Sequence, residues 1–255
     1  MSEPAVVRER RGRVLVITLN RPEQRNAVNG EVADGIAGAL DELDSDPGLS
    51  VGALTGAGKG FCAGMDLKAF VQGERPYAGD RGFAGITQRA SAKPLLAAIE
   101  GFAVAGGLEI ALACDLIVAA RGARLGVPEV KRSLVATGGA LLRLPRVLPR
   151  NVAAELALTG EPISAERAYE LGLVNRLAEP GEALSSALEL AEVIAANGPL
   201  ALAATKRILA ESVDWPEGEF FARQGEISGP VYASEDAREG ATAFAQKRAP
   251  VWKGR

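Results

Sequence analysis

The feature that most constrains the fold is a recurring order of short apolar strands, glycine-rich turns and helices in the first half of the chain. β-Branched and apolar residues predict strands over four segments, residues 13–19, 50–55, 94–99 and 116–120. Apolar residues at helical spacing predict a helix over residues 29–45, between the first two of these strands. Strands that alternate with helices in this way are typical of an α/β fold.

The remainder of the chain is more helical. Helices are predicted near residues 83–91 and 106–114, and the glycines of residues 70–82 predict a surface loop over a site. From Gly138 onward the pattern is almost entirely helical, with one short strand over residues 173–176.

The segment Asn197-Gly198-Pro199 is the predicted boundary between two parts of the chain. Residues 1–197 would form the α/β core that carries the site, and residues 198–255 a helical C-terminal region with an apolar face. Such a face packs either on a partner subunit or back on its own core, and the pattern allows both. We expect the helical region to serve oligomerisation.

The absence of histidine narrows the possible chemistry. Ser-His-Asp and Cys-His nucleophiles are excluded, and so is a zinc site with histidine ligands. Two scattered cysteines do not form a thiolate zinc site, so no metal is expected. Any general acid or base must therefore be Glu, Asp, Lys, Tyr or Cys.

The net charge and the cysteine content limit the kinds of binding partner and the cellular compartment that are expected. A net charge of −3 gives no general attraction to nucleic acid or to an anionic membrane. No uncharged apolar run is long enough to span a bilayer, and the first four residues lack a signal pattern. Cys62 and Cys114 form no disulfide framework and fit small buried side chains, which favours a reducing cytoplasm.

Two glutamates stand out as candidate acid/base groups. Glu109 follows Gly106-Gly107 at the head of an apolar helix, where an ionised side chain is costly unless something requires it. Glu129 lies 20 residues further on, after a Gly-Val-Pro turn. Glu109 could instead be a solvated first-turn residue, and Glu129 an ordinary helix start. Together, the two side chains suggest an acid/base pair for a carbonyl compound.

Two glycine-rich segments predict a backbone anion site. The loop over residues 56–64 matches neither the dinucleotide fingerprint nor the P-loop, and it places the N–H of Met65 at a loop-to-helix junction. The N–H of Gly106 lies at the start of the next helix, where negative charge is favoured. If both N–H groups converge on one oxygen, they form an oxyanion hole. The glycines could instead serve only a tight turn and close helix packing at Gly107.

Several segments in the same order resemble the crotonase family, which is the enoyl-CoA hydratase/isomerase superfamily. Residues 61–67 are similar to the F-x-A-G-x-D-L loop of that family, and residues 102–109 to its second loop with the first catalytic glutamate. The pair Pro128-Glu129 matches the second catalytic glutamate. Three later segments also match, namely Arg143-Leu144-Pro145-Arg146, Leu158-Thr159-Gly160 and residues 168–174.

The resemblance implies a spiral of β-β-α turns with a helical C-terminal region, assembled as a homotrimer or a dimer of trimers. The substrate would be an acyl-CoA thioester of fatty acid metabolism, its carbonyl held between the N–H groups of Met65 and Gly106. No cofactor is implied, because coenzyme A is part of the substrate.

The resemblance also implies residues that hold coenzyme A. The backbone near Ala63, Asp66 and Leu67 would hold the adenine end. Arg25 and Lys253 would meet its phosphates, Lys253 across a subunit interface.

Within the family, both glutamates mark hydratases, so the resemblance implies a hydro-lyase that adds water to a 2-enoyl-CoA. Residues 133–140 depart from the family's G-x-x-P-G-x-G-G segment, because Ser133 and Thr137 replace glycine and Ala136 replaces proline. Thr137 would lie near the water. Ala105 also replaces the first of three glycines. The alternatives are an enoyl-CoA isomerase, a carnitinyl-CoA-type dehydratase or a non-catalytic acyl-CoA binder.

Overall fold

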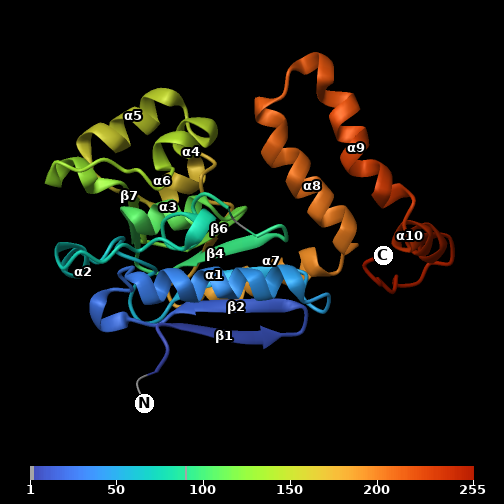
Figure 1. Ribbon diagram of the computed structural model, residues 1–255, viewed down its shortest axis with the longest axis horizontal. Helices are drawn as coiled ribbons and strands as arrows, with labels where there is room; N and C mark the ends of the chain where they lie inside the picture. Colours follow the sequence, from blue (N-terminus) through green and yellow to red (C-terminus); the bar gives the residue numbers. More distant parts are fainter. Residues whose placement is uncertain (1–2, 90) are drawn as a thin grey trace.

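A six-stranded sheet forms the centre of the computed structural model, which describes residues 3–89 and 91–255 (Figure 1). Its strands lie in the order β1-β2-β3-β4-β6-β9. β1 runs antiparallel to β2, and every later neighbour is parallel. The strands span β1 Val6–Arg11, β2 Val14–Leu19, β3 Val51–Gly56, β4 Leu95–Ile99, β6 Leu116–Ala120 and β9 Arg176–Ala178.

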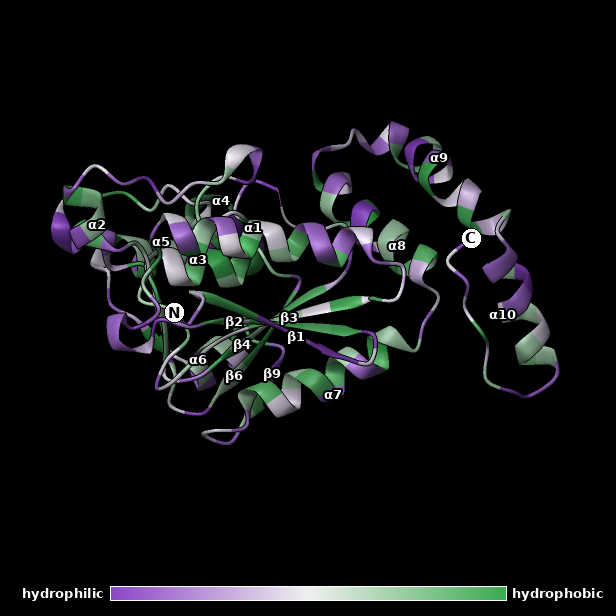
Figure 2. Cartoon of the chain, turned by 60° about the horizontal axis from the view of Figure 1, so that its bottom comes forward, coloured by the Kyte–Doolittle hydropathy of each residue, from purple (hydrophilic) through white to green (hydrophobic). Residues whose placement is uncertain are grey.

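Helices cover both faces of this sheet, α1 (Gly30–Ser45) on one and α7 (Ala183–Ala195) on the other (Figure 2). Alternate strand residues point to opposite faces, so Leu54 packs in the core beneath α1 and Ala53 in the core beneath α7. Helix α7 places an alanine toward the sheet at every fourth position from residue 183 to 195. These small side chains let the helix lie close to the strands.

A second, three-stranded sheet carries the turns that lead to the site. Its order is β5-β7-β8, with β5 (Phe102–Val104) parallel to β7 (Arg124–Gly126) and β8 (Ile163–Ser164) antiparallel to β7. Helix α3 (Gly106–Leu112) leaves the end of β5 and is buried along its whole length. The other helices of this part of the chain are α2 Leu67–Val71, α4 Ala140–Val147, α5 Arg150–Thr159 and α6 Ala165–Glu170.

The local structure differs from the sequence-based predictions in three places. β1 was not predicted, because five of its six side chains are exposed and it lacks an apolar alternation. The predicted helix near residues 83–91 is wrong: Phe83 forms a bridge with Tyr77, residues 84–89 form turns and bends, and Ala84 and Gly85 both have positive φ. Residue 90 lies outside the described residues. The strand predicted over residues 173–176 lies later, as β9.

The C-terminal helices form an arm that extends away from the sheet (Figure 1). They are α8 Pro199–Glu211, α9 Phe220–Tyr232 and α10 Glu235–Ala245. Helix α9 packs along α8, and its side chains Phe221 and Tyr232 are about four-fifths exposed, at 80% and 81%. Of the two packings that the sequence allowed, the arm as a whole does not fold back on the core of its own chain.

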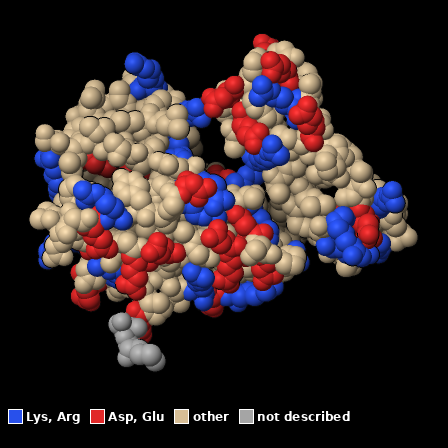
Figure 3. All heavy atoms as spheres, in the orientation of Figure 1, with Lys and Arg blue, Asp and Glu red and all other residues tan. Residues whose placement is uncertain are grey.

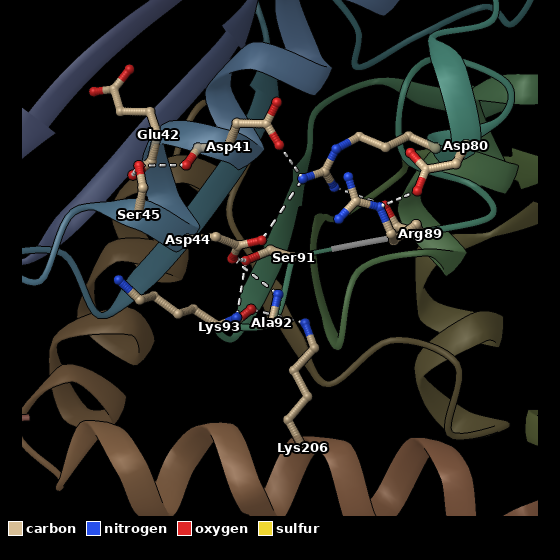
Figure 4. A network of polar contacts seen from close by, with 11 residues as sticks. Asp41, Glu42, Asp44, Ser45, Asp80, Arg89, Ser91, Ala92, Lys93 and Lys206 are labelled. Carbon is tan, nitrogen blue, oxygen red and sulfur yellow. Dashed lines mark hydrogen bonds and ion pairs between the residues drawn. The ribbon is translucent and has the colours of Figure 1, made fainter. Parts of the chain in front are cut away.

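Polar contacts of α8 tie the arm to the core, and Figure 4 shows the side chain of Lys206 extending from α8 toward Lys93. The Nζ of Lys206, on α8, donates to the carbonyl of Lys93 at 2.8 Å and to the carboxylate of Asp115 at 2.6 Å. Asp115 also accepts from the backbone N–H of Leu95 at the start of β4. Among the described residues, no single helix is long and apolar enough to cross a membrane, although α7 and residues 199–214, bent by 108°, pass together by length and composition.

Candidate active site

A cavity of about 650 Å³ opens beside the start of α3. The predicted glutamates and the predicted N–H donors, Met65 and Gly106, all line it. Its remaining walls come from residues near Ala63, from the segment 70–83 and from residues 128–138. The structure therefore brings into one space the groups that the sequence singled out.

The two glycine-rich segments lie side by side. Cys62 and Ala103 form a parallel bridge, and the N–H of Val104 donates to the carbonyl of Cys62 at 3.1 Å. One step further on, a Cβ placed on Gly64 would lie 2.9 Å from the nitrogen of Gly106. In the part of the chain that is described, neither the N–H of Met65 nor that of Gly106 has an acceptor. Both donors are thus free to meet an oxygen in the cavity.

The start of α3 is held by close backbone packing and by strain. A side chain on Gly107 would collide with the carbonyl of Cys62, so this glycine is required for packing, as one interpretation of the sequence had it. Ala105 precedes the helix with φ 53° and ψ −131°, a conformation that favours glycine. Its N–H donates to the carbonyl of Gly126 at 2.9 Å, which holds the strained residue in place.

We expect Ala105→Gly to raise the free energy of unfolding by about 1 kcal/mol, because strain of this kind costs about 1–3 kcal/mol and the added chain entropy offsets part of the gain. Urea unfolding measures the change. Ala103→Gly is the matched control, since Ala103 is a buried residue of β5 without positive φ and should lose stability. A less stable Ala105→Gly protein would contradict the assignment of strain.

Glu109 is buried, with 4% of its surface exposed, and its carboxylate faces the turn before α4. Its Oε1 accepts from the N–H of Ala140 at 3.2 Å. Burial raises the pKa of Glu109, whereas the backbone N–H groups of Ala140 and Gly138 and the charge of Arg143 oppose that rise. The backbone N–H groups therefore hold the carboxylate in one direction and favour its ionised form against the effect of burial.

Glu129 lies across the same cavity, on the short 3-10 helix Pro128–Arg132. Its Oε2 is buried and has no hydrogen-bond partner among the described residues. Burial raises the pKa of Glu129 to about 7, and the neighbouring charge of Glu109 acts in the same direction. A carboxyl group that titrates near neutral pH can both give and take a proton there.

This raised pKa has a cost in stability. Between pH 4.5 and about 7, Glu129 binds more protons in the folded than in the unfolded chain, so stability falls as the pH rises through that range. We expect Glu129→Gln to be more stable than the wild type by about 1–3 kcal/mol above about pH 8, with no advantage below about pH 4. Urea unfolding at the two pH values measures the difference. Glu189→Gln, which removes an exposed carboxylate on α7, is the matched control variant.

The predicted coenzyme A residues divide into two groups. Arg25, Ala63 and Leu67 line the cavity. The side chain of Asp66 does not: it accepts from the first N–H groups of α2 and pairs with Arg21 at 3.1 Å. Lys253 lies on the arm, where its Nζ meets Glu235 at 3.2 Å, so within a single chain it is away from the cavity.

The N–H groups that support Glu109 and most of the cavity wall were not predicted from the sequence. Residues 138–140 repeat the Gly-Gly-helix pattern that drew attention to Gly106, and this signal could have identified the N–H group of Ala140 as a donor. The wall residues carry no such signal, because they come together only when two separate segments, residues 70–83 and 132–135, fold around the cavity. They are Phe70, Arg75, Tyr77, Phe83, Arg132, Leu134 and Val135. Thr137 also lines the cavity, as expected.

Comparisons with known proteins agree with this arrangement. The enoyl-CoA hydratase/isomerase family profile matches residues 9–255. The crystal structure of an enoyl-CoA hydratase from Mycobacterium marinum superposes with a TM-score of 0.97 at 60% identity, covering 99% of this chain and 100% of that one. This likeness confirms the predicted crotonase-like α/β fold.

Two curated relatives are equally similar in sequence. An enoyl-CoA hydratase from Mycobacterium tuberculosis is 44% identical over 261 residues, covering 100% of this chain and 98% of the relative. A carnitinyl-CoA dehydratase from Salmonella typhi is 44% identical over 254 residues, covering 96% and 97%. Identity alone thus does not separate the two reactions. Sequence and structure together show that the chain belongs to the enoyl-CoA hydratase/isomerase family.

Proposed function

We propose that this chain is an enoyl-CoA hydratase, a hydro-lyase that adds water across the double bond of a 2-enoyl-CoA. The observation that carries the proposal is the meeting in one cavity of two N–H groups, which have no acceptor among the described residues, and two carboxyl groups of raised pKa. The donors suit a thioester oxygen that gains negative charge, and the carboxyl groups suit the protons that must move. The full-length match to the hydratase from Mycobacterium tuberculosis supports the same reaction.

The proposed mechanism assigns a role to each group. The thioester oxygen accepts from the N–H groups of Met65 and Gly106, so charge that builds there is stabilised. The N–H groups of residues 138 and 140 favour the ionised form of Glu109. Glu109 takes a proton from water while the oxygen of that water bonds to the β-carbon. Protonated Glu129 then gives a proton to the α-carbon. One glutamate has gained a proton and the other has lost one, so the total number of protons on Glu109 and Glu129 is unchanged. No cofactor takes part in the proposed reaction.

The charge of the cavity favours an uncharged acyl group over a carnitinyl group. Arg25, Arg75 and Arg132 line the cavity, and the charge of Arg132 acts on the carboxyl group of Glu129. The acids among the described lining residues are the two catalytic candidates. A trimethylammonium group would lose its water here and face charges of its own sign. Hydration of an uncharged enoyl chain is therefore the preferred reaction.

Coenzyme A would lie along the edge of the cavity formed by Ala63 and Leu67, with Arg25 near its phosphates. Backbone atoms near Asp66 would complete this edge, since the Asp66 side chain is engaged in capping α2. We further propose a reducing cytoplasm as the compartment, because both Cys62 and Cys114 are free thiols.

We also propose that the chain assembles as a homotrimer or a dimer of trimers through its helical C-terminal region, residues 198–255. The arm exposes large apolar side chains that its own core does not cover, namely Leu209, Val213, Phe221, Tyr232, Phe244 and Val251. The surface over α4 and α5 also carries little charge in Figure 3. In such an assembly Lys253 could reach the cavity of a neighbouring subunit. Sedimentation analysis tests the assembly.

The activity is tested with a series of 2-enoyl-CoA substrates, by loss of the enoyl absorbance and by mass spectrometry of the product. Hydration adds the mass of one water, whereas isomerisation leaves the mass unchanged. We expect kcat/KM for crotonyl-CoA to exceed that for crotonobetainyl-CoA by a factor on the order of 10². A folded protein that hydrates no chain length overturns the proposal. A preference for the cationic substrate would instead support the dehydratase.

A further inference from the structure

We propose that Arg143 is a positioning residue for the reaction. It holds in place the backbone cradle of Glu109, which is the turn over residues 138–140 whose N–H groups contact its carboxylate, and the wall segment 83–87. This inference rests on the proposed function for its kinetic consequences. The resemblance to the family singled out residues 143–146 only as a matching segment and assigned them no role. The contacts of the guanidinium group suggest one.

Arg143 joins two segments that flank the reacting groups. It lies on the first turn of α4, and its Nη2 donates to the carbonyl of Thr87 at 2.6 Å. Its Nη1 donates to the carbonyl of Gly138 at 3.3 Å. The guanidinium group thus fastens the end of the segment 83–87 to the turn that precedes α4. Its planar shape suits two carbonyl groups at once.

Each of these segments contacts a group that the reaction uses. The turn at Gly138 lies directly against the carboxylate of Glu109, where a side chain on Gly138 would collide with Oε2. The other segment carries Phe83, whose ring lies so near Gly106 that a Cβ there would approach it to 2.5 Å. A shift of either segment would move Glu109 or the N–H donor of Gly106.

Arg143 also acts on Glu109 through its charge. The guanidinium group is half-buried, and its positive charge favours the ionised form of Glu109 against the effect of burial. The effect is reciprocal, since Glu109 counters the lowering of the pKa of Arg143 that burial causes. Other ionisable groups facing the Arg143 and Glu109 pair are Glu129, Cys114 and Arg146. Loss of the arginine should therefore change both geometry and protonation.

The same helix offers a matched control. Arg146 lies one turn further along α4, is exposed, and pairs with Asp214 at 3.2 Å. Arg146 makes neither of the two hydrogen bonds to backbone carbonyl groups that Arg143 makes. Arg146→Met therefore removes an arginine from α4 without disturbing the cradle.

The test compares Arg143→Met, Arg143→Lys and Arg146→Met with the wild type in enoyl-CoA hydration across a range of pH. We expect Arg143→Met to lower kcat by about 10² with little change in KM, as a small misplacement of reacting groups does. Its kcat/KM profile should also move its acidic limb to higher pH, because Glu109 becomes easier to protonate. Arg143→Lys should restore the position of that limb but recover kcat only in part. Arg146→Met should match the wild type.

A second readout does not depend on the reaction. The carboxyl band of Glu109 is identified in the infrared spectrum by its loss in Glu109→Gln. The midpoint pH of its titration should rise in Arg143→Met and stay unchanged in Arg146→Met. If the wild type hydrates enoyl-CoA and Arg143→Met matches it in kcat and pH profile, the positioning role is overturned and the proposed function stands. If the wild type hydrates nothing, the proposed function fails, and the infrared titration still decides whether Arg143 controls Glu109.

Discussion

Glu109→Gln is expected to lower kcat for enoyl-CoA hydration by at least about 10², because a general acid or base contributes about 10²–10⁴ to a rate. The amide keeps the size of the carboxyl group but cannot take a proton from water. Glu129→Gln should cause a loss of the same order, since its amide cannot supply the proton to the α-carbon. Affinity for a saturated acyl-CoA should change little in either variant, because neither side chain is assigned to the coenzyme A part of the substrate.

Steady-state kinetics and equilibrium binding on the same preparations separate these effects. Glu189→Gln serves as the control, because it removes an exposed carboxylate on α7, away from the cavity. If either cavity variant keeps its rate within a few-fold, a non-catalytic acyl-CoA binder or a different site gains support. The double variant should lose little more than the worse single variant, since groups that act together are not additive.

The second large effect is expected from Gly64→Ala, which should lower kcat by about 10²–10³, the usual loss when one oxyanion donor is misplaced. Gly64 has φ 92°, and a Cβ there would lie 2.9 Å from the nitrogen of Gly106 and 3.2 Å from the carbonyl oxygen of Val104. The Cβ of Ala105 also lies 2.9 Å away, and because neither it nor these backbone atoms can rotate aside, the two donor loops must separate. KM should rise less than kcat falls, because the donors act on charge that develops during the reaction.

Gly181→Ala separates this local effect from general backbone strain. Gly181 has φ 90°, close to that of Gly64, but a Cβ there meets nothing within 4 Å. The control should lose stability to a similar extent through its left-handed conformation and keep its rate. An equal loss of rate in both variants would count against the oxyanion hole formed by Met65 and Gly106.

Much of the candidate site could be predicted because its signals are local. A glutamate at the head of an apolar helix and glycines at two helix starts are visible in the sequence, and each has a physical reason that does not depend on distant contacts. The predicted role of Lys253 is different, because in a single chain Lys253 lies on the arm, where it pairs with Glu235. The wall residues Phe70 and Tyr77 likewise take their places only after residues 70–83 fold over the cavity.

The errors in the fold have similar causes. β1 reads as a charged, exposed segment, yet all six of its residues pair with β2, from Val6 opposite Leu19 to Arg11 opposite Val14. Edge strands often carry such charge, which discourages pairing with other chains. The segment 83–89 reads as a helix, but Gly85 packs so tightly against the carbonyl of Ala33 on α1 that a side chain would collide there. Tertiary packing thus overrides the local pattern.

The described residues that line the cavity share one further property: apart from Arg25, all of them fall between Ala63 and Gly138. Substrate preference is therefore encoded in one continuous stretch of the gene, whereas the arm and the outer helices contribute no lining side chain from the same chain. Exchanging that stretch between related proteins should transfer the choice of acyl group while the rest of the scaffold stays the same. New specificities can arise in this fold without rebuilding it.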